Sequence, residues 1–318
     1  MRKLWATGLL FLFACQSSPT IVEPVTEEST GTPDVDVQPE ATSLLGEPLF
    51  SRKPSLEHGL KLVEDLARAE VALAENPDDE MAWVWLGRRL AYLGRYQEAI
   101  AFYGKGIERF PESYRLLRHR GHRYLTVRDF DAAIADLTKA AQLAEGHENQ
   151  LEPDGAPNPS GIPISSTHGN IHYHLGLAHY WKNELEAAYL AFQTAASFAM
   201  NEDAICSSHW WKYVLERSLG KTSASQFTLE RITPEMKLVE NFAYHRLLLA
   251  FKGVIAFDDL EATEAERYGL SLSYHWLGGT IEAVDLWTEL VESDDHRWEA
   301  FGTIGAEVML ARARSQRR

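Results

Sequence analysis

A fixed spacing between small residues constrains the fold of this chain more than any other feature. Three pairs of residues lie 34 positions apart, namely Gly87 and Gly121, Ala99 and Ala133, and Pro77 and Pro111. Three further small residues, Gly176, Ala188 and Ala195, each follow an earlier counterpart by 55 positions, which is the same period with 21 inserted residues. A unit of this length cannot bury an apolar face alone, so the period predicts stacked, mutually dependent repeats.

The residue types at these positions are those expected of crossing helices. Glycine and alanine allow two helix backbones to approach closely, and large residues such as Trp83, Tyr103 and Phe192 can fill the remaining space. Pro111 suits a break between two units because proline cannot continue a helix interior. Each unit is therefore predicted to be a helix–turn–helix.

The spacing and residue types resemble the tetratricopeptide (TPR) repeat family, on Trp83-x2-Leu86-Gly87, Ala99-x3-Tyr103 and Pro111. The second copy carries Gly121, Tyr124, Ala133 and Ala140, and the third carries Gly176, Ala188, Phe192 and Ala195. The resemblance covers about residues 54–318, strongly over 80–200. It implies an all-α fold, a right-handed α-α superhelix (solenoid) of antiparallel helix pairs. We expect clear repeats at 80–113, 114–147 and 169–202, degenerate repeats over 203–296, a capping helix at 297–314 and an N-terminal helix at about 56–74.

The first residues resemble a bacterial lipoprotein leader. Arg2 and Lys3 precede an apolar run, and Leu12-Phe13-Ala14-Cys15 resembles the lipobox. The resemblance implies a signal peptide over 1–14 and a lipid attached to Cys15, with Phe13 departing from the usual small residue. A transmembrane anchor needs about 20 apolar residues, and polar residues follow Cys15 at once. An ordinary cleaved secretory signal is the other alternative.

The segment after the cysteine is acidic and has no hydrophobic periodicity. It is rich in Pro, Thr and Ser and has no Lys or Arg between Gln16 and Leu49. Such a composition cannot offset the entropy of ordering, so residues 15–53 are predicted to be a disordered tether. Gln16, where an aspartate would imply inner-membrane retention, makes the bacterial outer membrane the expected location, with attachment through the lipid only.

Charge and motifs narrow the function. The net charge of −15 argues against nucleic acid or an anionic membrane surface as the main partner, since both require basic protein surface. Signatures of dinucleotide sites, zinc peptidases and serine hydrolases are absent, so we expect no enzyme and no cofactor. Cys206 is expected to be a buried apolar residue.

A group of histidines could form a metal site. On a helix, His168, His172 and His179 project within about 40° of one another, and His209 could join them from the next repeat. The pair at i and i+4 could bind a transition metal. However, His172 and His179 occupy positions that hold packing aromatics in the family, and no Cys, Asp or Glu has matching ligand spacing. A metal site is therefore the alternative, and structural histidines the expectation.

The inner face of the first helices carries the main functional hypothesis. Residues at the family's ligand-facing positions form an arginine cluster (Arg88, Arg115, Arg118 and His122) and an aromatic cluster (Tyr173, Tyr180, Trp181 and Trp210). Arginines suit a carboxylate through bidentate hydrogen bonds, and rings suit an apolar or ring-bearing group. The alternative is that these residues form a solvated face and inter-repeat packing.

Three hypotheses follow from these patterns. The first is a lipid-anchored scaffold of the cell envelope that holds a protein or peptide partner in its concave groove. The second is a glycan or small-molecule receptor that uses the aromatic cluster, and the third is a metal-dependent enzyme built on the histidines. The Pro- and Gly-rich insertion 147–167 is placed to border the groove.

Overall fold

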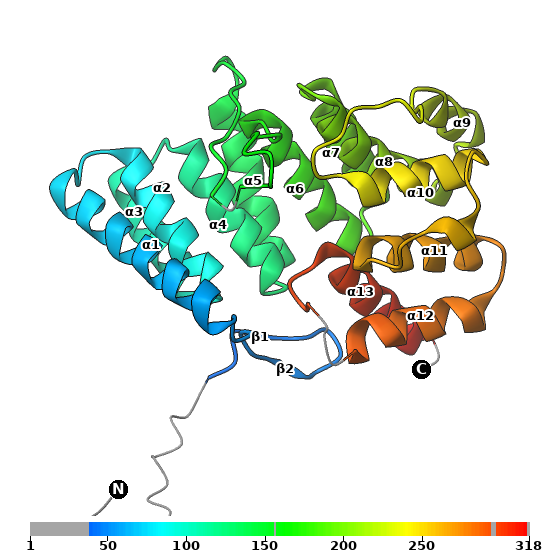
Figure 1. The fold of residues 1–318 in the computed structure, drawn as a ribbon, viewed down its shortest axis with the longest axis horizontal. Helices are drawn as coiled ribbons and strands as arrows, with labels where there is room; N and C mark the ends of the chain where they lie inside the picture. Colours follow the sequence, from blue (N-terminus) through cyan, green and yellow to red (C-terminus); the bar gives the residue numbers. More distant parts are fainter. Residues whose placement is uncertain (1–37, 156, 294–296, 317–318) are drawn as a thin grey trace, which may run out of the picture. The chain divides into compact units, whose positions relative to one another are not determined.

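A computed structural model describes residues 38–155, 157–293 and 297–316, and in these residues it contains thirteen α-helices and a short hairpin (Figure 1). The N-terminal part comprises β1 (Ala41–Thr42), β2 (Pro48–Leu49), α1 (Leu56–Glu75), α2 (Glu80–Tyr92), α3 (Tyr96–Arg109), α4 (Tyr114–Thr126) and α5 (Phe130–Ala144). The central part comprises α6 (Thr167–Trp181), α7 (Leu185–Ser197), α8 (Glu202–Ser218) and α9 (Thr222–Glu230). The C-terminal part comprises α10 (Phe242–Lys252), the 3₁₀ helix η1 (Phe257–Asp259), α11 (Glu264–Trp276), α12 (Thr280–Glu292) and α13 (Phe301–Gln316).

The helices pair as the period predicts. Helices α2 and α4 begin 34 residues apart, and each packs on the helix that follows it, as α6 packs on α7. Polar side chains cap the starts of these helices by accepting a backbone N–H. The capping residues include Asp79, Ser113, Asp129 and Ser166. The all-α solenoid of helix pairs is therefore confirmed.

Glycines occupy the tight crossings. A Cβ added at Gly87 would lie 2.2 Å from the Tyr103 ring, and one at Gly121 would lie 2.7 Å from Leu137. At Gly176, the same atom would lie 2.6 Å from Phe192. These distances are shorter than any van der Waals contact, so the helices could not pack this closely with a larger residue.

The predicted tether 15–53 is wrong in its C-terminal part. Residues 41–49 form an antiparallel hairpin, and Glu40 is bound by the backbone N–H and the side chain of Gln97 at 2.8 and 2.7 Å. Further along, the indole N–H of Trp298 donates to the carbonyl of Phe50 at 2.8 Å. The segment is ordered because its partners lie in distant parts of the chain, which local composition does not register. The predicted signal peptide 1–14, Cys15 and the tether up to residue 37 lie outside the described residues.

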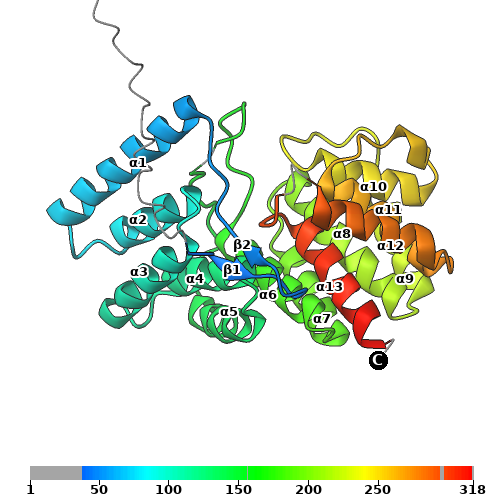
Figure 2. The same cartoon turned by 90° about the horizontal axis from the view of Figure 1, so that it is seen from below.

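The C-terminal helix does more than cap the last pair. Helix α13 packs on α11 and α12, as expected of a cap. Its Arg312 also donates to the carbonyls of Tyr180 and Trp181 at 2.9 and 3.1 Å, so α13 runs beside the end of α6 (Figure 2). The last helix therefore contacts the middle of the repeat array.

A buried ion pair joins three distant segments. Arg128, in the turn between α4 and α5, contacts Glu307 of α13 at 2.7 Å, and both side chains are 2% exposed. The same guanidinium donates to the carbonyl of Trp298 at 2.8 Å. The Glu307 carboxylate also accepts the backbone N–H of Leu44 in the hairpin at 2.6 Å. Removing one partner would leave an uncompensated buried charge, so the hairpin, the repeats and α13 depend on one another.

Among the described residues, no helix combines the length and the apolar character that crossing a membrane requires.

Candidate functional site

Most residues of the aromatic cluster belong to the hydrophobic core. Tyr180, Trp181 and Trp210 are between 0 and 4% exposed, so the prediction that they line an open groove is wrong. Trp181 lies between Phe130 and Phe301, with ring centroids 5.5 and 5.7 Å away. The residues at the family's ligand-facing positions do point inward, but helices α10, α11 and α13 pack against them and exclude solvent. A glycan receptor built on these rings is therefore not supported.

The arginine cluster is more accessible but not uniformly so. Arg88 and Arg115 are half-buried, whereas Arg118 is buried and pairs with Glu152 of the insertion at 2.9 Å. The Arg88 guanidinium donates to the carbonyl of Pro153 at 2.8 Å. The insertion therefore does border the inner face, and it contacts all three predicted arginines, with Arg115 donating to the side chain of Gln150 at 3.4 Å.

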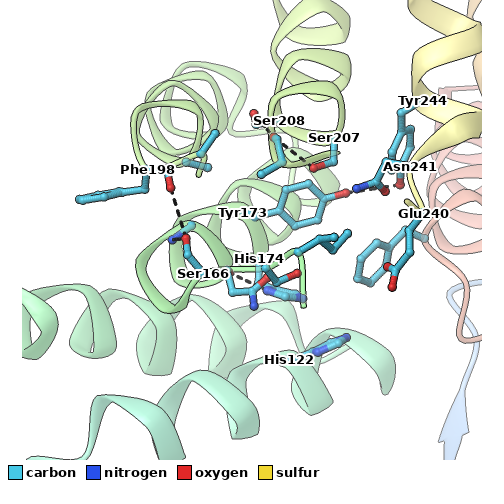
Figure 3. Close-up of a pocket in the computed structure, with 18 of the residues that line it drawn as sticks. His122, Ser166, Tyr173, His174, Phe198, Ser207, Ser208, Glu240, Asn241 and Tyr244 are labelled. Atoms are coloured by element: carbon cyan, nitrogen blue, oxygen red, sulfur yellow. Dashed lines mark hydrogen bonds between the residues drawn. The ribbon is translucent and has the colours of Figure 1, made fainter. Parts of the chain in front are cut away.

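An open cleft of about 330 Å³ lies on the inner face. Four first helices contribute to it, with Arg118 and His122 from α4, Gly169, Asn170, Tyr173 and His174 from α6, Ser207 and Ser208 from α8, and Tyr244 from α10 (Figure 3). Phe301 and residues 164–166 of the insertion close its sides. Of the predicted groove residues, the structure thus brings Arg118, His122 and Tyr173 to this cleft.

A buried aspartate builds one wall of the cleft. Asp203, which is 1% exposed at the start of α8, accepts the backbone N–H groups of Val239, Glu240 and Asn241 at 2.8–2.9 Å. These bonds fix the segment before α10 and place Glu240 and Asn241 at the rim. Three backbone N–H donors satisfy the hydrogen-bonding capacity of the Asp203 carboxylate, so it can be buried without a cationic partner.

Two tyrosines from different helices build a further wall of the cleft. The hydroxyl of Tyr173 accepts the indole N–H of Trp211 at 2.8 Å and donates to the hydroxyl of Tyr244 at 3.3 Å. Both tyrosine hydroxyls have a raised pKa because burial disfavours the phenolate. The wall is therefore neutral and its rings are fixed.

Histidines near the arginine cluster are neutral at pH 7. Burial, and then nearby arginines, lower the pKa of His119, His122 and His174 well below the usual value. The rings of His122 and His174 lie 4.2 Å apart, and Nδ1 of His174 contacts the carbonyl of Asn170 at 2.6 Å. Arg118 is thus the permanent cation in this part of the cleft.

The alternative metal ligands are not assembled. His168 and His172 both pack on Phe198, and His179 pairs with Glu184 at 2.6 Å. His209 is buried on α8, where burial and nearby cations lower its pKa to about 4. Within the described part of the chain, no three His, Cys, Asp or Glu residues are positioned to hold a metal ion. The helical spacing aligned the histidines on one side of α6, but that side packs on aromatic residues.

Cys206 is a packing residue. It is fully buried, its Sγ lies 3.9 Å from the sulfur of Met236, and burial raises its pKa to about 12. The expectation of a buried apolar cysteine is confirmed.

Several residues that line or support these sites were not predicted. Asn241 and Tyr244 line the cleft, Glu152 lines a second open space beside the arginines, and Asp203 holds the segment before α10. They lie in the insertion or in degenerate repeats, where the period no longer assigns inward positions. The sequence offered a signal for one of these residues. Asp203 is an acidic residue in the first turn of a helix that is already capped by Asn201, so its carboxylate is free to bind another segment.

The comparison with protein families identifies one repeat in this chain. The tetratricopeptide repeat model matches residues 81–113. Among solved structures, the chain is similar to a tetratricopeptide repeat protein from Parabacteroides merdae, with 15% identity, a TM-score of 0.48 and coverage of 80% of this chain and 97% of that one. It is also similar to YrrB, a TPR protein with an unusual peptide-binding site, with 15% identity, a TM-score of 0.43 and coverage of 73% and 95%.

A third similar structure is TTC0263, a thermophilic TPR protein of Thermus thermophilus, with 16% identity, a TM-score of 0.38 and coverage of 73% and 100%. No curated protein matches the chain. The matched repeat coincides with α2 and α3, and α4–α5 and α6–α7 repeat their pairing and glycine crossings. The chain contains a tetratricopeptide repeat at residues 81–113, and the two helix pairs that follow have the same arrangement.

Proposed function

We propose that this chain is a lipid-anchored scaffold of the bacterial cell envelope, and that it holds a peptide segment of a protein partner in the inner cleft. The observation that carries this proposal is the position of the cleft. It lies on four first helices, α4, α6, α8 and α10, and remains open although other parts of the inner face are filled by the chain itself.

The size and lining of the cleft fit a peptide segment. Its volume of about 330 Å³ is at the lower end of the range for ligand pockets, so it accommodates one or two side chains and not a folded surface. The lining combines the polar groups of Asn170, Ser207 and Asn241 with the rings of Tyr173 and Tyr244, and it also includes the charged side chains Arg118 and Glu240. Such a lining provides hydrogen bonds for a main chain and apolar contact for a side chain.

A cleft-filling variant tests the site. A photo-crosslinking residue at Ser207 should capture the partner in the native envelope, whereas the same residue at Leu190, exposed on α7, should not. Ser207→Trp should then weaken binding of the captured partner at least about tenfold, because the indole occupies the cleft. Ser218→Trp, at an exposed position of the same helix, is the matched control. Equal binding by both variants would exclude the cleft as the partner site.

The anchor is tested separately. The leader-like residues 2–15 support attachment at Cys15, with outer-membrane location following from Gln16. Cys15→Ser should release the mature chain into the soluble envelope fraction on fractionation. A variant that stays bound to the membrane to the same extent would exclude lipid anchoring.

A further inference from the structure

The insertion between α5 and α6 is held against the arginine cluster by polar contacts. The carboxylate of Glu152 contacts Arg118 at 2.9 Å and accepts the side-chain amide of Asn170, also at 2.9 Å. Glu152 and Arg118 are 12% and 8% exposed at their side chains. The carboxylate is therefore enclosed by a cation and an amide, as a bound ligand carboxylate would be.

Two further contacts recognise the main chain of the insertion. Arg88 donates to the carbonyl of Pro153, and Arg89 donates to the carbonyl of Gly155 at 2.9 Å. The inner face thus binds one carboxylate and two backbone carbonyls that follow it closely. These contacts use one acidic side chain and two backbone carbonyls of the insertion, and Arg115 adds a longer contact of 3.4 Å to the Gln150 side chain.

The insertion has few apolar attachments near these contacts. Leu151, adjacent to Glu152, is 43% exposed, and Ile162, later in the insertion, is 53% exposed. A second open space of about 350 Å³ lies beneath residues 150–153, between them and Met81, Val84 and Arg115. Because little apolar surface is buried here, an equivalent peptide could replace these residues without a large loss of hydrophobic contact.

The receptor also retains unused hydrogen-bonding capacity. Within the described residues, Nε of the buried Arg118 has no hydrogen-bond partner. Arg118 contributes to the wall of the cleft, and its partner Glu152 lines the second open space. A buried guanidinium with an unsatisfied N–H favours a second acceptor beside it.

We propose that Arg118, Asn170 and Arg88 form a receptor for an extended acidic peptide, and that the chain's own Glu152 segment occupies it. A partner carrying an exposed glutamate or aspartate in an extended segment binds by displacing residues 150–155. This inference rests on the proposed function, because it places the partner on the same inner face. It adds the chemistry of the partner and a built-in competitor that sets the affinity.

A peptide copied from the insertion tests the receptor directly. The probe is fluorescein-labelled Glu148–Gly155 with blocked ends, and its binding to the full folded domain is measured by fluorescence anisotropy. In the wild type, the tethered segment competes at an effective concentration of about millimolar. Glu152→Gln should therefore bind the probe at least about tenfold more tightly than the wild type.

Two controls separate recognition from misfolding. Glu152→Asp keeps the charge but shortens the side chain, so it should give an intermediate affinity even if Glu152→Gln folds poorly. A probe with glutamine in place of its own Glu152 should bind every variant weakly, and adding Arg118→Gln to Glu152→Asp should abolish binding of the original probe. Equal affinity for the wild type and both Glu152 variants, or no binding to either variant, would overturn the proposal.

Other results of these binding experiments would contradict particular parts of the proposal. Dimers of the wild type that disappear on mixing with the probe would mean that the insertion pairs with a second copy, which overturns displacement by a different partner. The Ser207→Trp result does not depend on the probe, so failure of the receptor leaves the cleft assignment intact. A probe that binds as expected but does not compete with a partner captured at Ser207 would instead contradict a shared inner-face site.

Discussion

The arginine and aromatic clusters occupy equivalent positions in successive repeats, yet the structure uses them differently. Trp210, from the aromatic cluster, is fully buried against Tyr244 and Phe251. Arg115, from the arginine cluster, keeps 29% of its side chain exposed. The difference arises from what covers each region, because α10, α11 and α13 fold onto the aromatic cluster, whereas the arginines meet the insertion and, at Arg115, Glu80 of α2. Inward orientation in a repeat therefore does not by itself make a residue a ligand contact.

The largest effect is expected in the aromatic cluster. Trp210→Ala should lower the free energy of unfolding by about 3–5 kcal/mol, because it removes a large, fully enclosed side chain. Urea denaturation followed by circular dichroism measures this loss. Phe227→Ala is the control, since Phe227 is 61% exposed and its replacement should change stability by less than about 0.5 kcal/mol. Similar small effects for both would mean that Trp210 is available to a ligand after all.

A further large effect is expected in the helix that carries most of the arginine cluster. Gly121→Leu should destabilise the fold by more than about 2 kcal/mol, because the added atoms overlap buried Leu137 and force α4 and α5 apart. Gly104→Ala is the control, since its new Cβ would find no atom closer than 3.6 Å. That control should be neutral or stabilising by up to about 1 kcal/mol. An unchanged melting temperature for Gly121→Leu would show that the register placing these arginines is incorrect.

These two sites also show what could be predicted from the sequence. Gly121 and Leu137 are close in the chain, so a local period records their contact and gives the helix pairs and the inward positions correctly. The covering of the aromatic cluster and the order of the hairpin depend on pairs such as Arg128–Glu307 and Leu44–Glu307, which are 179 and 263 positions apart. No local pattern encodes such distant partners. For that reason the sequence did not predict that the aromatic cluster is buried or that the tether ends before the hairpin.

A pH titration distinguishes buried from accessible surroundings on α8. His209, next to Trp210, has a pKa of about 4 in the folded chain, against an ordinary value near 6.5. The unfolded chain therefore binds more protons below about pH 6.5, so stability falls as the pH is lowered towards the folded pKa. For this group the loss between pH 7 and pH 5 is about 1.8 kcal/mol. In urea unfolding at the two pH values, His209→Gln should reduce the difference by about this amount, and an unaltered difference would mean that His209 is solvated.

The smallest effect is expected at Arg115, and it sharpens the comparison within the arginine cluster itself. Arg115 lies 3.9 Å from Glu80 and makes a 3.4 Å contact with Gln150, both long contacts in a partly solvated position. Arg115→Gln should change the free energy of unfolding by less than about 0.5 kcal/mol, because exposed ion pairs contribute little.

Arg118→Gln should lower the free energy of unfolding by about 3–5 kcal/mol, since it leaves the enclosed carboxylate of Glu152 without its cation. Replacing the three arginines together would therefore perturb the fold through Arg118 alone, and only single variants at Arg88 and Arg115 report on binding. Equal costs at Arg115 and Arg118 in urea denaturation would mean that the insertion does not enclose its carboxylate in solution, and the cluster would then be a uniformly solvated face.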